Sequence, residues 1–563
     1  MKKYLAVLFL LLISLTAICQ WNSNSSINTI LSNGTVSENI IVSVSDGANG
    51  NISFFSDFTV NGDFYAQKIS AAGIVAWGSI SSPVPICITT SEKNGLNAIP
   101  DGSGGAFIAW RDYRNDPLAS DIYIQRINSA GLVQWAANGV RVTNNATQND
   151  LAVLLCTDGA GGIIITWQGD DNAAQNIQTF AQRFNSTGIA QWAANGVMVC
   201  TAPGFRWPSH IAADGSNGAF IFFTDTRNDP NGLNYSFTAA NDFINTDIYG
   251  QRLNGSGVPL WTNNGSAIIT AAGNQNNQVG SGAIPQGNGG IIPDGSGGVI
   301  LVFDDGRNEP PQDITNYDVY AQKVNSSGAP QWAANGVAVC TAAGNQVVAD
   351  VATDAAGGII AAIKYDDDKR IYGQRITNAG TALWAVNGIA VSVMTDLVFD
   401  ASIVTDASGN SIFTYAVANT FIKAQKLNTA GLLQWAGAGV IICSATSAAP
   451  NFANAVSSDN GSAIITWTDF RNLMLPSGID AFAEKVLANG TLAGAGVIYI
   501  SAANGNWNNP ATWVGGIVPP AGSQINIRHS IIANVNAVCK NLNIELPGGN
   551  LTVVSGVTFT VIN

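Results

Sequence analysis

The chain is poor in the side chains that most enzymes use for catalysis. Its 563 residues include only two histidines, His210 and His529, and five glutamates, and charged residues make up 11% of the total. The sequence contains no HExxH, no G-x-x-x-x-G-K-[ST] loop, no Cys-x-x-Cys pair and no G-x-S-x-G elbow. Assignments as a metalloprotease, a nucleotide-binding protein or a serine hydrolase therefore lack their core residues.

Positive charge is also scarce. The chain has 24 Lys and Arg against 37 Asp and Glu, which gives a net charge of -13. Because phosphate binding needs clustered Lys and Arg, this balance argues against a nucleic-acid partner. Beyond the N-terminus no apolar run is long enough to span a bilayer, so we expect no membrane span. Binding of cations or neutral glycans stays open.

The N-terminal stretch MKKYLAVLFLLLISLTAICQ combines a basic start, an apolar run from Leu5 to Leu15 and a small-x-small step at Ala17 and Cys19. This pattern predicts a signal peptide over residues 1–19 and a product that is secreted or held at the outer cell surface. A lipoprotein with acylated Cys19 is the weaker alternative, because Ile18 is bulky where lipid-modifying cleavage needs a small residue.

Six cysteines remain after residue 19, and four of them (Cys87, Cys200, Cys340 and Cys443) recur at one position of a repeated pattern. A repeat array would hold these four too far apart to pair with one another. We expect them to be small buried apolar side chains.

The repeated pattern is clearest in DGSGGAFIAWRDYRN, residues 101–115, and variants of it begin at seven other aspartates: Asp46, Asp158, Asp214, Asp294, Asp354, Asp406 and Asp459. A Gln-Lys or Gln-Arg pair and a Trp follow in most copies, and successive Trp residues are 58, 57, 69, 71, 52 and 51 positions apart. Each copy holds four short β-type runs, and strand-only periods of this size are typical of propeller blades. The sequence predicts an all-β fold, an eight-bladed β-propeller of four-stranded blades over residues 20–498.

In the second copy we expect strands at Leu96–Pro100, Ala106–Arg111, Asp121–Ile127 and Val133–Val142. The D-G-x-G-G and N-x-x-G tracts between them supply residues that tolerate positive φ in tight turns. The D-x-R-N cluster after the second strand predicts a loop pinned by an Asp-Arg pair. The Trp, placed on the fourth strand, should fill the space between adjacent sheets with its N–H bonded to a neighbour.

The eighth copy lacks the Leu-Gln-Trp step of its predecessor, whereas the mature N-terminus reads QWNSNSSINTI, which is similar to the fourth-strand text QWAANGVRVTN from Gln134. We expect this N-terminal segment to complete the last blade and close the ring, so that no sheet edge stays open.

From Tyr499 the text changes to W-N-N-P-A-T-W-x-G-G-x-x-P followed by short V/I-rich runs, up to Asn563. This segment resembles the G8-like and β-helix-associated modules of large secreted proteins of Bacteroidota, which implies strands in successive rungs or a small sandwich over residues 499–563. No sorting domain of the kind that ends such proteins is present, so we expect this module to be incomplete.

The repeats themselves resemble those of secreted repeat propellers exported through type IX secretion in that phylum. The resemblance covers roughly residues 20 to 500, and its motifs are turn and packing signals. It implies fold and export route only.

The lengths of the loops indicate which face of the ring is the candidate for ligand recognition. The connections of a four-stranded meander alternate between two ends, and all the length variation falls at the end that carries the second-to-third loops. The fourth and fifth copies have long loops there, from Asn228 to Asp247 and from Asn308 to Asp318, and a Gly-rich connection from Ala271 lies between them. Long loops on a rigid scaffold are a common place for recognition.

These loops carry the candidate ligand residues, which are Tyr235, Phe237, Asp242, Phe243, Asp247, Asp313, Tyr317 and Asp318. Aromatic rings and carboxylates of this kind would suit stacking on a sugar or a Ca²⁺ ion with oxygen ligands. The alternative is that the aromatic rings only pack the loops onto their blades. The sequence does not decide whether any metal is bound.

A second candidate site uses one polar residue near the start of the first strand in six copies: Asn97, Asp150, His210, Asp350, Asp400 and Asn454. These side chains would line the mouth of the central channel, where a cation or small polar ligand could bind. Solvated strand ends would explain the same pattern.

The absence of catalytic motifs favours a monomeric, non-catalytic adhesion module that recognises an extracellular glycan or protein through the long loops. A carbohydrate-active lyase or hydrolase would instead need two carboxylates held across one bond. A structural spacer is the third hypothesis.

Overall fold

The computed structural model describes residues 21–563 except for 23, 27, 34–36, 58–60, 145–148, 171–176, 231–244, 277–289, 309–315, 419, 445–449, 472–477, 494–497, 515–517, 520–522, 545–547 and 562–563. The chain divides into two compact units, of which one is Asn24–Ala493 and the other contains Gly494–Asn563 together with the first 23 residues.

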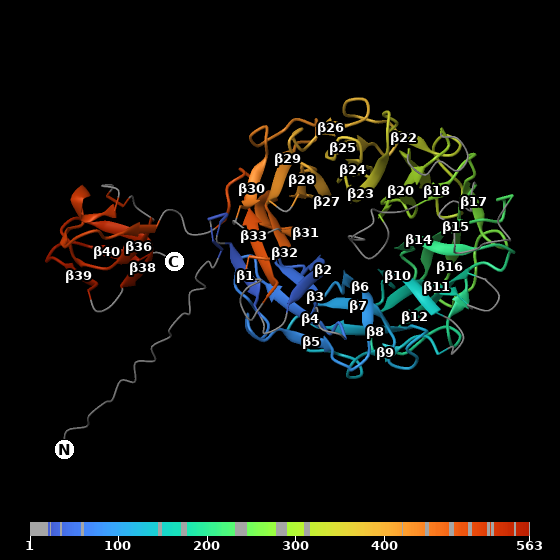
Figure 1. Ribbon diagram of the computed structural model, residues 1–563, viewed down its shortest axis with the longest axis horizontal. Coiled ribbons are helices and arrows are strands. Elements are labelled where there is room, and N and C mark those ends of the chain that lie inside the picture. The colour runs from blue at the N-terminus through green and yellow to red at the C-terminus, as the bar shows by residue number, and fades with distance from the viewer. Residues whose placement is uncertain are drawn as a thin grey trace, which may run out of the picture. The chain divides into compact units, whose positions relative to one another are not determined.

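The larger unit is an eight-bladed β-propeller. Figure 1 shows its sheets arranged radially around a central axis, with β2, β6, β10, β14, β23, β27 and β31 innermost. From inner to outer strand, the first four blades are β2 (Glu38–Ser45), β3 (Asn51–Asp57), β4 (Phe64–Ile69) and β5 (Val84–Cys87); β6 (Lys93–Pro100), β7 (Ala106–Asp112), β8 (Asp121–Ile127) and β9 (Val140–Arg141); β10 (Asn149–Thr157), β11 (Ile163–Asp170), β12 (Ile177–Phe184) and β13 (Val197–Met198); and β14 (Arg206–Ala213), β15 (Ala219–Asp225), β16 (Asp247–Leu253) and β17 (Ser266–Ile269).

The remaining blades follow the same order. They are β18 (Gln275–Asn276) and β19 (Ile291–Pro293), which both pair with β20 (Val299–Asp305), then β21 (Asp318–Val324) and β22 (Val337–Cys340); β23 (Gln346–Thr353), β24 (Ile359–Tyr365), β25 (Arg370–Ile376) and β26 (Ile389–Ala390); β27 (Val398–Thr405), β28 (Ser411–Val417), β29 (Phe421–Leu427) and β30 (Val440–Cys443); and β31 (Asn451–Ser457), β32 (Ala463–Asp469), β33 (Asp480–Val486) and β1 (Thr29–Ser32). All pairs within the blades are antiparallel, and a 3₁₀ turn spans Asp459–Gly461.

The second blade corrects one prediction. Its outer strand β9 covers only Val140–Arg141, whereas the sequence predicted a strand from Val133 to Val142. Val133 makes only an isolated bridge to Ile127, and residues 135–139 form a turn. The buried Gln125 side chain bonds the backbone of that turn and so draws it out of the β-ladder. Trp135 therefore lies in a turn and not on a strand.

The N-terminal strand β1 closes the ring. It pairs antiparallel with β33 through Thr29 opposite Ala483 and Ile30 opposite Phe482, and becomes the outer strand of the eighth blade. The first and last blades are also joined by hydrogen bonds between β2, the inner strand of the first blade, and β32, the second strand of the eighth, such as Ile40 N–H to Thr468 Oγ1 at 2.9 Å. A sheet edge that would otherwise invite pairing with another chain is thereby covered.

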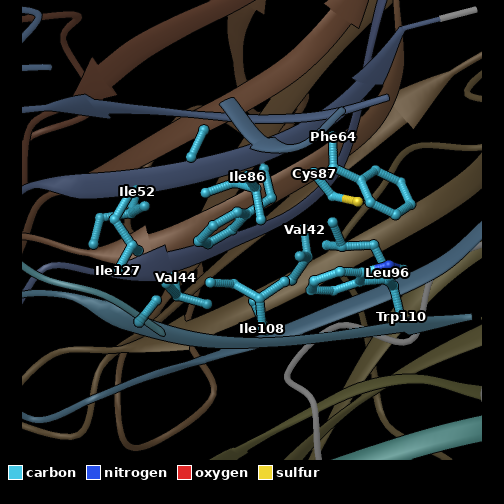
Figure 2. Close-up of a cluster of buried hydrophobic side chains, with 14 of the residues drawn as sticks. Val42, Val44, Ile52, Phe64, Ile86, Cys87, Leu96, Ile108, Trp110 and Ile127 are labelled. Atoms are coloured by element: carbon cyan, nitrogen blue, oxygen red, sulfur yellow. The ribbon is translucent and has the colours of Figure 1, made fainter. Parts of the chain in front are cut away.

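The hydrophobic core lies between neighbouring blades. Figure 2 shows one such layer, where Val42, Ile52 and Phe64 of the first blade share a buried cluster with Ile108 and Trp110 of the second. Comparable clusters follow at the other blade junctions. Burying one Val, Leu, Ile or Phe side chain contributes roughly 1.5–3 kcal/mol, so each junction is a large source of stability.

All six described cysteines are buried and free. The prediction that the four repeated ones do not pair with one another is confirmed, because they lie in four different blades: Cys87, Cys340 and Cys443 end the outer strands β5, β22 and β30, and Cys200 follows β13.

The smaller unit contains two parallel sheets, β34 (Ile498–Ile500), β36 (Ser523–Ile527), β38 (Ala537–Ile544) and β40 (Phe559–Val561), and β35 (Gly505–Asn506), β37 (Ser530–Ala533) and β39 (Asn550–Val553). Strands alternate between the two sheets along the chain, so successive turns stack as rungs. A 3₁₀ turn spans Pro510–Thr512, and Trp507 and Trp513 pack edge to face at 4.9 Å in the unit's own core.

Candidate functional site

The D-x-R-N cluster is a loop pin, and the second blade shows its parts. Asp112 is fully buried and accepts hydrogen bonds from the backbone and guanidinium of Arg114 and from the Trp110 indole N–H at 3.0 Å. The Arg114 guanidinium stacks over the Tyr123 ring at 3.9 Å. Asn115 completes the pin by donating to the Asp121 carboxylate at 2.7 Å.

The long loops of the fourth and fifth blades start and end on this same pin. Asn228 donates to Asp247 at 2.6 Å, and Asn308 donates to Asp318 at 2.7 Å. The guanidinium of Arg227 lies 3.8 Å from the Tyr249 ring centre. Burial raises the pKa of Asp247 to about 6, against the lowering effect of the Asn228 hydrogen bond. Asp247 and Asp318 are thus occupied in anchoring the loops.

The lengths of these connections differ strongly. The second and third strands are joined by residues 113–120 in the second blade, 306–317 in the fifth and 226–246 in the fourth, which are 8, 12 and 21 residues. Of the candidate ligand residues, Tyr235, Phe237, Asp242, Phe243 and Asp313 lie outside the described part of the chain. Tyr317 is partly buried at the end of the fifth-blade loop, where its backbone N–H donates to Asn345 at 2.8 Å.

The inner strand of the fifth blade is split. In neighbouring blades this strand carries a single register shift, for example between Val348 and Asp350. In the fifth blade β18 and β19 pair with the two ends of β20, and residues 277–290 are inserted between them. The sequence predicts a connection between two blades for the Gly-rich segment from Ala271. Most of this segment instead lies between the two parts of the fifth blade's inner strand.

His210 of the fourth blade bonds to the fifth blade where that strand is split. Its Nε2 lies 3.1 Å from the carbonyl oxygen of Val302, and its Nδ1 lies 2.9 Å from Ser209 Oγ. Because a carbonyl only accepts, Nε2 carries the proton. Complete burial lowers the pKa of His210 to about 4, so the ring is neutral at physiological pH. This geometry makes His210 a tie between blades.

Two other candidates for the channel mouth make similar ties. Asn97 donates to the Val153 carbonyl of the next blade at 3.2 Å, and Asp350 accepts from the Ile403 N–H of the next blade at 2.9 Å. Burial raises the pKa of Asp350 to about 7, and the nearby Asp400 acts in the same direction. Asn454 is buried at the equivalent register position of the eighth blade.

Asp150 and Asp400 lie nearer the start of their inner strands than the other four. Asp150 pairs with Gly169, which stands where the second blade has Asp112. A Cβ at Gly169 would lie 3.5 Å from Asp150 Oδ1, so the carboxyl of the opposing strand takes up the place of the missing Asp. Burial raises the pKa of Asp150 to about 7, with Thr143 and Trp167 acting to lower it. Asp400 is partly exposed, and its pKa is also raised to about 7, chiefly by desolvation.

The turns on the opposite face also use their polar atoms internally. Asp101 accepts from Gly105 N–H at 2.9 Å and forms an ion pair with Arg126 at 2.8 Å. The Trp135 indole N–H donates to the Ser186 carbonyl in the next blade at 3.1 Å, which confirms its predicted contact between sheets. The structural role of the Gln in each Gln-Lys or Gln-Arg pair was not predicted from the sequence. Its repetition at one position of the copies is the signal that could have indicated this role.

Among the described residues, no cluster of three or more His, Cys, Asp or Glu side chains is arranged to hold a metal ion. The described chain also contains no helix with the length and apolarity needed to cross a membrane. What the described residues do provide is a rigid base for the insertions of the fourth and fifth blades.

No family model matches the chain, and no curated protein does. A puromycin hydrolase mutant complexed with PGG aligns with 80% of this chain and 61% of its own length, at 11% identity and a TM-score of 0.43. Prolyl oligopeptidase B from Galerina marginata aligns over 86% and 59%, at 11% identity and a TM-score of 0.40. An ulvan lyase of a new polysaccharide lyase family aligns over 62% and 80%, at 12% identity and a TM-score of 0.38.

This chain spans less than two thirds of the puromycin hydrolase and of prolyl oligopeptidase B. At TM-scores below 0.5 these likenesses carry no argument about activity. The propeller assignment depends on the strand pairing described above.

Proposed function

We propose that the protein is a secreted or cell-surface binding module, without catalytic activity, that recognises an extracellular glycan or protein through the long-loop face of the fourth and fifth blades. The observation that carries this proposal is the repeated pin at the base of both loops. The same Asn-to-Asp hydrogen bond holds an 8-residue connection in the second blade and a 21-residue connection in the fourth.

The Asn and Asp at the two ends of the loop stay the same when the loop between them becomes longer. The longer loop can therefore present variable residues without loss of stability in the blade. The pin residues are already bonded to one another, so recognition falls to residues between Asn228 and Asp247 and between Asn308 and Asp318. Aromatic and acidic side chains in those segments suit a glycan ligand, with or without Ca²⁺.

The proposal is tested by exchanging one connection for another. Residues 229–246 are replaced by Asp116–Ser120 of the second blade, which keeps the flanking Asn228 and Asp247 of the pin. Binding of residues 20–563 to a glycan array, with and without Ca²⁺, should disappear in this variant while its thermal unfolding stays unchanged.

The matched control carries Leu132→Ser and Ile189→Ser. These side chains are 62% and 61% exposed on the turns of the opposite face. The control should bind as the parent protein does. Binding that survives the loop exchange, or that is lost in the control, would contradict the assignment of recognition to the long-loop face. Absence of glycan binding by every variant would exclude the glycan and leave a protein partner to be sought on the same face.

A further inference from the structure

Seven blades carry a buried Gln at one position of the third strand, namely Gln67, Gln125, Gln182, Gln251, Gln322, Gln374 and Gln425. In the second blade the side-chain amide of Gln125 both accepts and donates a hydrogen bond. Gln125 Oε1 accepts from Trp135 N–H at 3.0 Å, and Nε2 donates to the Ala136 carbonyl at 2.8 Å. The position therefore needs one acceptor atom and one donor atom to hold the turn before the outer strand.

The eighth blade has Glu484 at this position. Glu484 follows Ala483, which pairs with Thr29 of the closing strand β1, so it lies where β1 begins. Its side chain is 0% exposed. Oε1 accepts from Lys485 N–H at 3.0 Å, and Oε2 has no hydrogen-bond partner among the residues that the structure describes.

Two cations of the eighth blade, Lys485 and Arg471, are each paired with an aspartate. Lys485 Nζ pairs with Asp459. On the side of β1, Arg471 pairs with Asp469 and donates to Asn28 Oδ1 at 3.1 Å. The Cys443 thiol lies 3.3 Å from Arg471 Nη2. Burial accordingly raises the pKa of Glu484 to about 9, with Lys485 N–H and Asn28 opposing it.

A protonated carboxyl offers one donor and one acceptor, as an amide does, whereas a carboxylate only accepts and would be a buried charge without a cation. We propose that β1 is a proton-dependent latch: the propeller ring is closed by its N-terminal strand while Glu484 is protonated, and the strand is released more readily once Glu484 ionises. This property is independent of the ligand proposed above.

The direction of the pH dependence follows from the pKa of Glu484 with β1 in place and with β1 detached. Burial raises the pKa of Glu484 from the ordinary glutamate value of 4.5 to about 9 with β1 in place, and the proposal requires the pKa to fall back toward the ordinary value when β1 detaches and water reaches the carboxyl. The stabilisation of the closed state is complete below about 4.5 and is lost as pH rises through about 9. The equilibrium constant for opening should increase by up to about tenfold per pH unit over this interval.

The experiment is amide hydrogen exchange of the whole protein at several pH values, corrected for the intrinsic rate. Protection of residues 29–32 should fall by one or more orders of magnitude between pH 6 and pH 9 relative to that of the outer strand β13. The Glu484→Gln variant should show the same protection at both pH values. A pH dependence that is equal in the parent protein and this variant would overturn the proposal.

Two further variants keep the result interpretable if Glu484→Gln folds poorly. Gln425→Glu places the same acid in the seventh blade and should make β30, but not β1, pH-dependent. A Thr29→Cys and Ala483→Cys pair, oxidised across the β1–β33 ladder, should abolish the pH dependence of residues 29–32. If the cross-linked protein still loses protection there on alkalinisation, the latch is excluded.

Discussion

At the scale of single residues, several acidic side chains of the described chain hold loops and turns in place. The carboxyl of Asp112 is held by Arg114 and Trp110 within its own blade. In the third blade a glycine stands at that position, and Asp150 reaches across from the neighbouring strand. β-pairing thus places a carboxyl beside the same position in both blades, but neither oxygen of Asp150 has a hydrogen-bond partner among the described residues, whereas Asp112 is fully bonded.

Asp150→Asn should make the stability of the protein less dependent on pH in the range from about pH 4 to pH 7. With a pKa of about 7 in the folded protein and about 3.9 when unfolded, Asp150 contributes stability that is complete below about pH 4 and is lost as pH rises through 7. The variant should gain stability relative to the parent between pH 5 and pH 8, by at most about 1.4 kcal/mol per pH unit. Urea unfolding at both pH values measures this.

The control for this comparison is Asp367→Asn, since that carboxyl lies on the surface. It should leave the difference between pH 5 and pH 8 unaltered. If the stability of Asp150→Asn equals that of the parent protein at both pH values, the Asp150 carboxyl of the parent is not desolvated as described.

At the scale of elements, the first seven blades are each joined to the next by a Trp that lies on a glycine turn. A Cβ at Gly131 would meet Trp77 Cγ at 2.7 Å, and the Trp77 indole N–H donates to the Ser129 carbonyl of the same turn at 3.0 Å. The N-x-x-G motif thus needs its glycine for two reasons, the positive φ of the turn and the close approach of the indole ring.

Gly131→Ala and Gly102→Ala separate these two reasons. Both positions have positive φ, +79° and +73°, but nothing lies within 4 Å of a Cβ at Gly102. Gly102→Ala should cost roughly 1–2 kcal/mol from backbone strain alone. Gly131→Ala should cost about 1–3 kcal/mol more because the methyl group overpacks against Trp77. Equal losses in chemical denaturation would refute the packing role of the indole.

At the scale of the whole molecule, the ring depends on a strand that comes from the other end of the propeller sequence. Removal of residues 20–32 would leave β33 with an unpaired edge, which is a template for pairing with another chain. We expect this truncated protein to associate or aggregate more than the parent protein does at the same concentration, as measured by light scattering. A stable, monomeric truncated protein would show that β1 is dispensable for closure.

The two compact units should fold separately. Each has its own buried cluster, and Trp507, Trp513 and Ile527 belong to that of the smaller unit. A protein that ends at Ala493 should keep the thermal transition of the propeller to within a few degrees. A large drop in this transition temperature would indicate that the smaller unit contributes to propeller stability.

The sequence by itself predicted the propeller class, a count of eight repeats, the second and third strands of the second blade and the tight turns between strands. These follow from local signals, such as D-G-x-G-G, N-x-x-G and the alternation of apolar residues, whose partners lie within a few positions. The closing role of the N-terminus could also be predicted, because the missing fourth-strand text of the last copy has its counterpart there.

Only the tertiary structure decided which polar residues are ties. His210 meets Val302, 92 positions away, and Asp350 meets Ile403, 53 positions away. A candidate list drawn from residue type alone could not distinguish a ligand from such a tie, because the partner is supplied by the next blade. The short length of outer strands such as β9 also depends on a tertiary contact. A buried Gln side chain holds the preceding turn away from the ladder, and no propensity of the turn residues themselves predicts that contact.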